Sequence, residues 1–145
     1  MTEIQIGGRT IPLLYTTCEM EQIQKELGCT GFQLKEKVFG VRLVNEDDPE
    51  SVVMDVVTDG ELAGRLCTLI RILGNAGLEE NGEAADLTDK WVKRRMKPGM
   101  IPVYAVIALT EIMDGNRMES PEKEGPQGPV DEGLEEENAK KQPGN

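Results

Sequence analysis

The first fifteen residues alternate between apolar and polar side chains in two short runs. Residues 3–6 and 9–15 follow this two-residue period, which is typical of strands with one buried face. Between them stand Gly7 and Gly8, which accept the positive φ angles of a tight primed turn. Pro12 has no amide hydrogen to donate, so the second strand should lie at an edge or be interrupted there. The pattern predicts a β-hairpin.

Helical periods follow this hairpin. Thr16 and Glu19 have the spacing of a capping box. The helix that they begin should cover residues 17–27 and bury one apolar face, formed by Met20, Ile23 and Leu27. Thr30 and Gln33 repeat the capping spacing before a shorter helix. Its apolar face would consist of Phe32, Leu34, Val38 and Phe39.

The next two elements differ in how clearly the sequence marks them. Residues 52–57 are rich in valine, and we predict a helix there, although the same run fits a strand. From Asp59 onward the helical period is clear, with apolar residues at Leu62, Leu66, Leu69, Ile70 and Leu73. Gly74, Asn75 and Gly77 offer left-handed caps, so this core helix should end near them, before a polar loop over 79–86.

Two more helices are expected before Gly115. Thr88 caps one that contains Trp91, Val92 and Met96, and Pro98 ends it. Residues 102–113 are apolar on nearly every face, so the helix that they form needs cover on all sides. Either it lies at the centre of the core, or part of it contacts another copy or a partner. In the second case the methionines nearby would give adaptable contacts: Met96, Met100 and Met113.

Composition separates a folded body from a tail. The length of 145 residues suits one domain, and 51 of the first 114 residues are apolar against four of the last 31. The last 31 residues include eight acids together with several glycines and prolines, a composition typical of disorder. We therefore predict an α+β, mostly helical domain over 1–114, with an N-terminal β-hairpin followed by about five helices, and a disordered acidic tail over 115–145.

Charge and residue types restrict the possible chemistry. The formal net charge is −11 and there is no histidine. An acidic body repels phosphate backbones, which argues against nucleic acid as a partner. Without imidazole, Ser/His and Cys/His pairs and the commonest metal ligand are excluded. Cys18, Cys29 and Cys67 lack the spacing of zinc ligands, and we expect free thiols that act as small buried hydrophobes in a reducing cytosol. The sequence predicts no enzyme activity and no cofactor.

Other acidic segments and the N-terminus add no site. Residues 45–48 lack the alternating acids and the closing glutamate of a calcium loop, so an acidic turn is favoured. Glu79 and Glu80 fall in an expected loop, where nothing would tune a pKa for acid/base catalysis. There is no basic region followed by an apolar run at the N-terminus, and no apolar stretch of membrane-spanning length. A soluble intracellular protein without a membrane partner is expected.

Basic residues cluster around Trp91. Lys90, Arg94 and Lys97 would share one helical face by their spacing. The cluster is either a surface for an acidic partner, including the acidic tail of another copy, or a solvated helix face with Trp91 turned to the core. The candidate partner-binding residues are those of this cluster and of the apolar helix that follows: Lys90, Trp91, Lys93, Arg94, Lys97, Met100, Tyr104 and Ile107.

Four short motifs resemble the tail assembly chaperones of long-tailed bacteriophages and prophages of Firmicutes. The first is the hairpin over residues 4–13, which is followed by a Met/Glu-rich helix ending in Gly28. The others are residues 69–78 (Leu-Ile-Arg-Ile-Leu-Gly-Asn-Ala-Gly-Leu), residues 86–92 (Asp-Leu-Thr-Asp-Lys-Trp-Val), and Pro98-Gly99 with residues 115–119. The resemblance covers about residues 4 to 119.

The resemblance implies a non-enzymatic assembly factor in the host cell cytoplasm. Such chaperones coat the aggregation-prone tape measure protein, help to recruit tail tube protein around it, and are absent from the mature virion. Self-association is also expected. Members often gain a second domain by a minus-one ribosomal frameshift; Ala139-Lys140-Lys141 can be encoded by a slippery run, or can be ordinary residues of a charged tail. The alternative is an acidic nucleic-acid mimic, a phage inhibitor that presents carboxylates to a DNA-binding enzyme.

Overall fold

The N-terminal hairpin forms as predicted. In the computed structural model, which describes residues 1–118, β1 (Thr2–Ile6) pairs antiparallel with β2 (Arg9–Leu13). Gly7 and Gly8 make the turn with φ angles of 60° and 76°, which only glycine adopts without strain. The alternation puts four apolar side chains in the core: Ile4, Ile6, Ile11 and Leu13. The hairpin therefore has one buried face, as a two-stranded sheet needs for stability.

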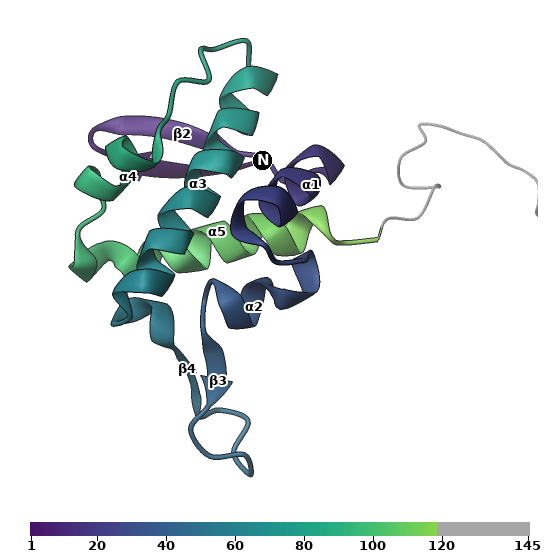
Figure 1. Cartoon of the computed structure of the whole chain (residues 1–145), viewed down its shortest axis with the longest axis vertical. Helices are drawn as coiled ribbons and strands as arrows, with labels where there is room; N and C mark the ends of the chain where they lie inside the picture. Colours follow the sequence, from purple (N-terminus) through teal and green to yellow (C-terminus); the bar gives the residue numbers. More distant parts are fainter. Residues whose placement is uncertain (119–145) are drawn as a thin grey trace, which may run out of the picture. The chain divides into compact units, whose positions relative to one another are not determined.

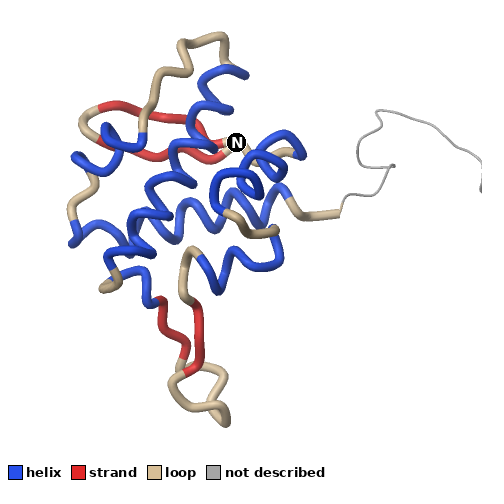
Figure 2. The backbone as a smooth tube through the Cα atoms, in the orientation of Figure 1, coloured by secondary structure: helices blue, strands red, loops and turns tan. Residues whose placement is uncertain are grey.

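The remaining elements confirm an α+β, mostly helical fold (Figures 1 and 2). Within residues 1–118 there are five α-helices and a second two-stranded sheet. The helices are α1 (Thr17–Leu27), α2 (Leu34–Lys37), α3 (Gly60–Glu80), α4 (Asp89–Arg95) and α5 (Ile101–Gly115). The second sheet pairs β3 (Val41–Leu43) with β4 (Val52–Met54). The same described residues also contain three single-turn 3₁₀ segments: η1 (Gly31–Gln33), η2 (Asp55–Val57) and η3 (Pro98–Met100).

Helix α3 is the centre of the body and is longer than predicted. The expectation that it ends near Gly74, Asn75 and Gly77 is wrong, because the helix continues to Glu80. These glycines allow close packing. A Cβ at Gly77 would lie 2.1 Å from the carbonyl oxygen of Pro12, and one at Gly74 would lie 2.7 Å from Cδ1 of Leu87. The backbone of β2 therefore rests directly on α3, and the amide of Leu14 donates to the carbonyl of Leu73 at 3.0 Å.

Asn75 also differs from its predicted capping role. Its side-chain amide donates to the carbonyl of Leu87 at 3.1 Å, and its carbonyl oxygen accepts from the amide of Leu87 at 2.9 Å. This pair of hydrogen bonds resembles the pairing between two β-strand backbones, and it holds the polar loop that follows α3 against the helix. The position of α4, which begins at Asp89, depends on this contact.

The predicted helix over residues 52–57 is wrong, and the strand alternative is correct for its first half. Val52–Met54 pairs antiparallel with Val41–Leu43 as β4 and β3, and only Asp55–Val57 turns, as a 3₁₀ segment. β-Branched residues favour the pleated conformation when a partner strand is available, and sequence periodicity gave no sign of that partner. The resulting ribbon extends away from the helices (Figure 1).

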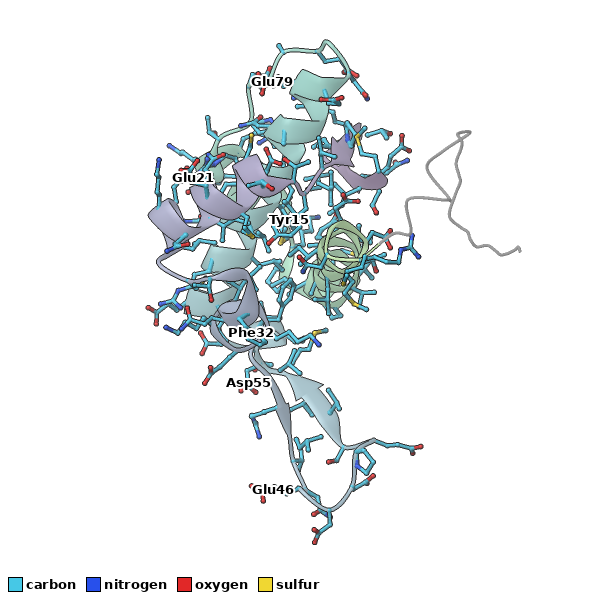
Figure 3. All side chains as sticks on the ribbon, turned by 90° about the vertical axis from the view of Figure 1, so that its right-hand side faces the viewer. Tyr15, Glu21, Phe32, Glu46, Asp55 and Glu79 are labelled. Carbon is cyan, nitrogen blue, oxygen red and sulfur yellow. The ribbon has the colours of Figure 1, made fainter. Side chains whose placement is uncertain are left out.

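The second capping box is confirmed, but the apolar face predicted beyond it is only partly buried. The amide of Thr30 donates to the side chain of Gln33 at 3.0 Å, at the start of η1. Leu34, Val38 and Phe39 are buried, whereas Phe32 has an exposed fraction of 99%. The helical run that we expected is split between η1 and α2, so Phe32 is turned away from the face that Leu34 buries (Figure 3).

Helix α5 is covered on one side only. Tyr104, Ala105, Ala108 and Ile112 are buried, and the buried carboxylate of Glu111 accepts from the amides of Thr2 and Tyr15 at 2.9 and 3.2 Å. This carboxylate ties the open end of the first hairpin to α5 and satisfies two backbone donors. The helix ends at Gly115, and residues 119–145 of the predicted disordered tail, with Ala139-Lys140-Lys141, lie outside the described residues.

The contact between β2 and α3 predicts opposite effects for two glycine substitutions in one helix. Gly77→Ala should destabilise the fold by about 1–3 kcal/mol, because the backbone oxygen of Pro12 cannot yield to a methyl group and the gain in helix propensity is only about 1 kcal/mol. In Gly64→Ala the new Cβ meets nothing nearer than 3.9 Å, so stability should rise by up to about 1 kcal/mol. Urea unfolding of both variants measures this; equal stabilisation would refute the close approach.

Candidate partner-binding surfaces

Helix α4 carries most of the predicted site and is fixed at both ends. The hydroxyl of Thr88 accepts from the amide of Trp91 at 3.1 Å, which confirms the predicted cap. At the other end Met96 leaves the helix and is buried, with its sulfur 3.6 Å from that of Cys67. Because α4 ends at Arg95, Lys97 does not share a helical face with Lys90 and Arg94, and that part of the prediction is wrong.

A charged network fastens α4 to α1 and α3. The guanidinium of Arg71 donates to Glu26 on α1 through two nitrogens and to Asp89 on α4 at 2.8 Å. Thr68 donates to the second oxygen of Asp89 at 2.9 Å. This network could not be predicted from the sequence, since Glu26, Arg71 and Asp89 are far apart in the chain and charged residues at these positions are ordinary on helix surfaces.

These contacts change the ionisation of all three groups. The hydrogen bond from Arg71, helped by one from Gln22, holds the pKa of Glu26 below its ordinary value. Burial alone would raise the pKa of Asp89, but hydrogen bonds from Arg71 and Thr68 outweigh burial and lower it. The pKa of Arg71 is raised, chiefly by its hydrogen bond to Glu26. The charged forms are therefore favoured, as expected for a structural ion-pair network.

Trp91 lies beneath two guanidinium groups. The guanidinium of Arg95 is 4.5 Å from the centre of the indole ring, and that of Arg9 is 5.9 Å away. Arg9 also pairs with Asp86 at 3.0 Å. These cation–π contacts join α4 to the first hairpin, and the ring is half-buried. Trp91 and Arg95 thus hold α4 in place. This arrangement favours the interpretation that Trp91 is turned to the core over the one that it is an exposed binding residue.

Four cations of the predicted cluster remain exposed. Within residues 1–118 they have no carboxylate partner within ion-pair distance: Lys90, Lys93, Arg94 and Lys97. We call these four residues the α4 cationic surface. Arg9 and Arg95 border it through Trp91, and Arg9 could not be predicted as a neighbour because it comes from the distant first hairpin. The surface is a dense positive area on an otherwise acidic body, suited to contact with carboxylates.

The apolar candidates on α5 divide between core and surface. Tyr104 is buried and its hydroxyl donates to the carbonyl of Gln5 at 3.0 Å, so it cannot meet a partner from this position, contrary to our expectation. Ile107 is half-buried, and Met100 has an exposed fraction of 43%. The exposed large apolar residues of this segment are Met100, in η3 directly before α5, and Val103, Val106 and Met113 on α5. We call these four residues the α5 apolar stripe.

The stripe follows helical geometry. Val103, Val106 and Met113 recur at intervals of three and seven residues, which places them on one side of a helix, and Thr110 lies between them. Val103 and Val106 were not among the predicted site residues. These two residues could not be singled out from the sequence, because a segment that is hydrophobic on nearly every face has no periodicity that indicates which side faces solvent.

The three cysteines differ in burial. Cys29 and Cys67 are buried, and burial raises the pKa of both thiols, that of Cys67 to about 11, so both stay protonated near neutral pH. Cys18 is exposed, so the prediction of a buried thiol is wrong for that residue. Among residues 1–118, no group of three or more acidic or cysteine side chains is arranged to hold a metal ion.

The Arg71 network predicts a pH-dependent contribution to stability. Glu26 and Asp89 have lowered pKa values, so their contribution is complete above the ordinary carboxyl values of about 4 and is lost as the pH falls through the lower folded values. Arg71→Met should cost about 1–3 kcal/mol at pH 7 and much less near pH 3.

Urea unfolding of this variant and of the wild type at both pH values measures the difference. Arg65→Met is the matched control, because it removes a cation from the same helix without touching Glu26 or Asp89. A loss that is equally large at both pH values would show that Arg71 acts through packing and not through the two carboxylates.

No single helix within residues 1–118 is long and apolar enough to cross a membrane. Helix α4 and residues 98–115 together have the length and composition of a membrane span, but the two segments are bent by 90° at their junction.

Comparison with known proteins does not assign these surfaces. No protein-family model, curated protein sequence or solved structure matches this chain.

Proposed function

We propose that this chain is a tail assembly chaperone of a long-tailed bacteriophage, acting in the host cell cytoplasm, which binds the tape measure protein and helps to recruit tail tube protein. The observation that carries the proposal is the α5 apolar stripe: Val103, Val106 and Met113 lie along α5 and Met100 lies in the turn directly before it, with exposed fractions of 43–58%. The motifs that resemble this family supply the identity of the client.

The stripe has the properties that a chaperone for a long apolar client needs. Its opposite side is anchored by Tyr104, Ala105, Ala108 and Ile112, so the backbone that carries the exposed side chains is already ordered before a client binds. Methionine and valine side chains accept many apolar partners, because they make no directional contacts. An apolar stripe of this kind can cover the hydrophobic positions of an amphipathic client helix.

Charge supports the same function in a different way. A formal net charge of −11 opposes non-specific association of the chaperone and of any complex that it coats. The exposed α5 stripe would otherwise favour aggregation, since contiguous apolar surface is uncommon on monomeric proteins. We infer that an acidic body and an apolar stripe together let the protein hold a client without precipitating with it.

Substitution of one valine tests this proposal. Val106→Asp places a charge in the middle of the stripe. When the variant is co-expressed with the tape measure protein encoded in the same genome, it should recover at least about tenfold less of that protein in a pull-down. The fold should survive, because Val106 is exposed. Met20→Asp is the control, since Met20 is an exposed apolar residue of comparable accessibility on α1. Equal recovery with both variants, each folded by circular dichroism, would contradict client binding by α5.

A further inference from the structure

The β3–β4 ribbon projects from the body and has apolar sides. Its two strands pair only with each other among the described residues, so both outer edges are open. Leu43, Val44 and Val52 have exposed fractions of 40, 66 and 51%. Short, isolated ribbons are marginally stable in water, and apolar residues on them are usually covered by another surface. The ribbon therefore has the composition of a docking element.

The tip of this ribbon is strongly acidic and ordered. Four exposed carboxylates lie within five residues, at Glu46, Asp47, Asp48 and Glu50, and within residues 1–118 none of them has a cation within ion-pair distance. Figure 3 shows Glu46 at the far end of the ribbon, beyond Asp55 at its base. We call these four residues the acidic tip.

Hydrogen bonds within the loop fix the shape of the acidic tip. The amide of Asp47 donates to the side chain of Asn45, and the amide of Glu50 donates to the side chain of Asp48, both at 3.0 Å. The hydroxyl of Ser51 donates to the carbonyls of Asn45 and Asp48 at 2.9 and 2.7 Å. Like charges are thus held close together, and a cationic partner would relieve their mutual repulsion.

The α4 cationic surface is the complement of the acidic tip, but it belongs to a different part of the fold. Figure 1 shows the ribbon pointing away from α4, so the tip of one molecule does not reach the cationic surface of the same molecule. The two surfaces have equal and opposite formal charge, four carboxylates against Lys90, Lys93, Arg94 and Lys97.

We propose that the acidic tip of one molecule docks on the α4 cationic surface of a second copy of this chain. The two contact surfaces differ, so the association is head to tail, and a pair of molecules keeps one free tip and one free cationic surface for further copies. In a protein with a net charge of −11, most orientations of two copies repel, and this one brings opposite charges together. The proposal uses residues outside the α5 stripe and does not depend on the proposed client.

Charge reversal on each side tests the contact. The patch variant, Lys90→Glu with Arg94→Glu, and the tip variant, Glu46→Lys with Asp47→Lys, alter exposed side chains that form no hydrogen bond in the structure, and they leave Asp48 to order the loop. Sedimentation velocity of the full-length protein, from micromolar to millimolar concentration in about 50 mM salt, measures association. We expect a concentration-dependent rise in mass for the wild type and association at least about tenfold weaker for each variant.

Matched controls separate local charge from net charge. Lys35→Glu with Lys37→Glu changes the net charge as the patch variant does, and Glu79→Lys with Glu80→Lys changes it as the tip variant does, at exposed residues away from both surfaces. Both controls should associate like the wild type. Combining the patch and tip variants in one chain restores opposite charges across the contact and should recover association.

Two results would overturn the proposal. The first is a wild type that stays monomeric over the whole range, and the second is a tip variant that associates like the wild type. If Glu135→Lys with Glu136→Lys loses association in that second case, the C-terminal acids and not the acidic tip occupy the cationic surface. Val106→Asp should leave this association unchanged, so failure of client binding and failure of self-association can be told apart.

Discussion

The close approach of β2 to α3 at Gly77 determines where the other elements lie. With no side chain between the carbonyl of Pro12 and the helix backbone, the first hairpin sits at a fixed height on α3. Its turn then meets α4, where a Cβ at Gly7 would lie 2.7 Å from Cδ of Arg95. Its open end meets α5 through Glu111. One constraint on distance, set by the lack of a side chain, thus places both helices that carry the candidate surfaces.

Features that depend on neighbours in sequence could be predicted, and features that depend on distant contacts could not. The first hairpin, the capping boxes at Thr16 and Thr30 and the cap at Thr88 are local, and all four are present. A glycine in a helical run marks either the end of the helix or a site where another element approaches the helix backbone closely. For Gly77 only the position of β2 decides between these two interpretations. The ribbon is similar, since β4 is a strand only because β3 lies beside it.

The segments that carry the candidate site could be predicted from the sequence, but the individual residues that face solvent could not. The sequence predicts a cationic area near Trp91 and an apolar area after Met100, and both exist. Sequence spacing alone does not separate the cations that hold the fold from those that face solvent. Arg95 covers Trp91 and Arg71 bridges two helices, whereas Lys90 and Arg94 are exposed. Tyr104 was misassigned for a related reason, because an aromatic residue in an apolar run suits a core and a contact surface equally well.

The separation of the three surfaces bears on how the proposed chaperone would hold a long client. The acidic tip and the α4 cationic surface use residues other than those of the α5 stripe, so the proposed contact between copies would leave the stripe free. A head-to-tail series of copies would then repeat the stripe at a regular interval. Each copy already bound to a client raises the effective concentration of the next stripe, so weak apolar contacts add to a strong total. A small stripe on each copy is sufficient under that arrangement, and the free protein avoids the larger apolar area that would make it aggregate.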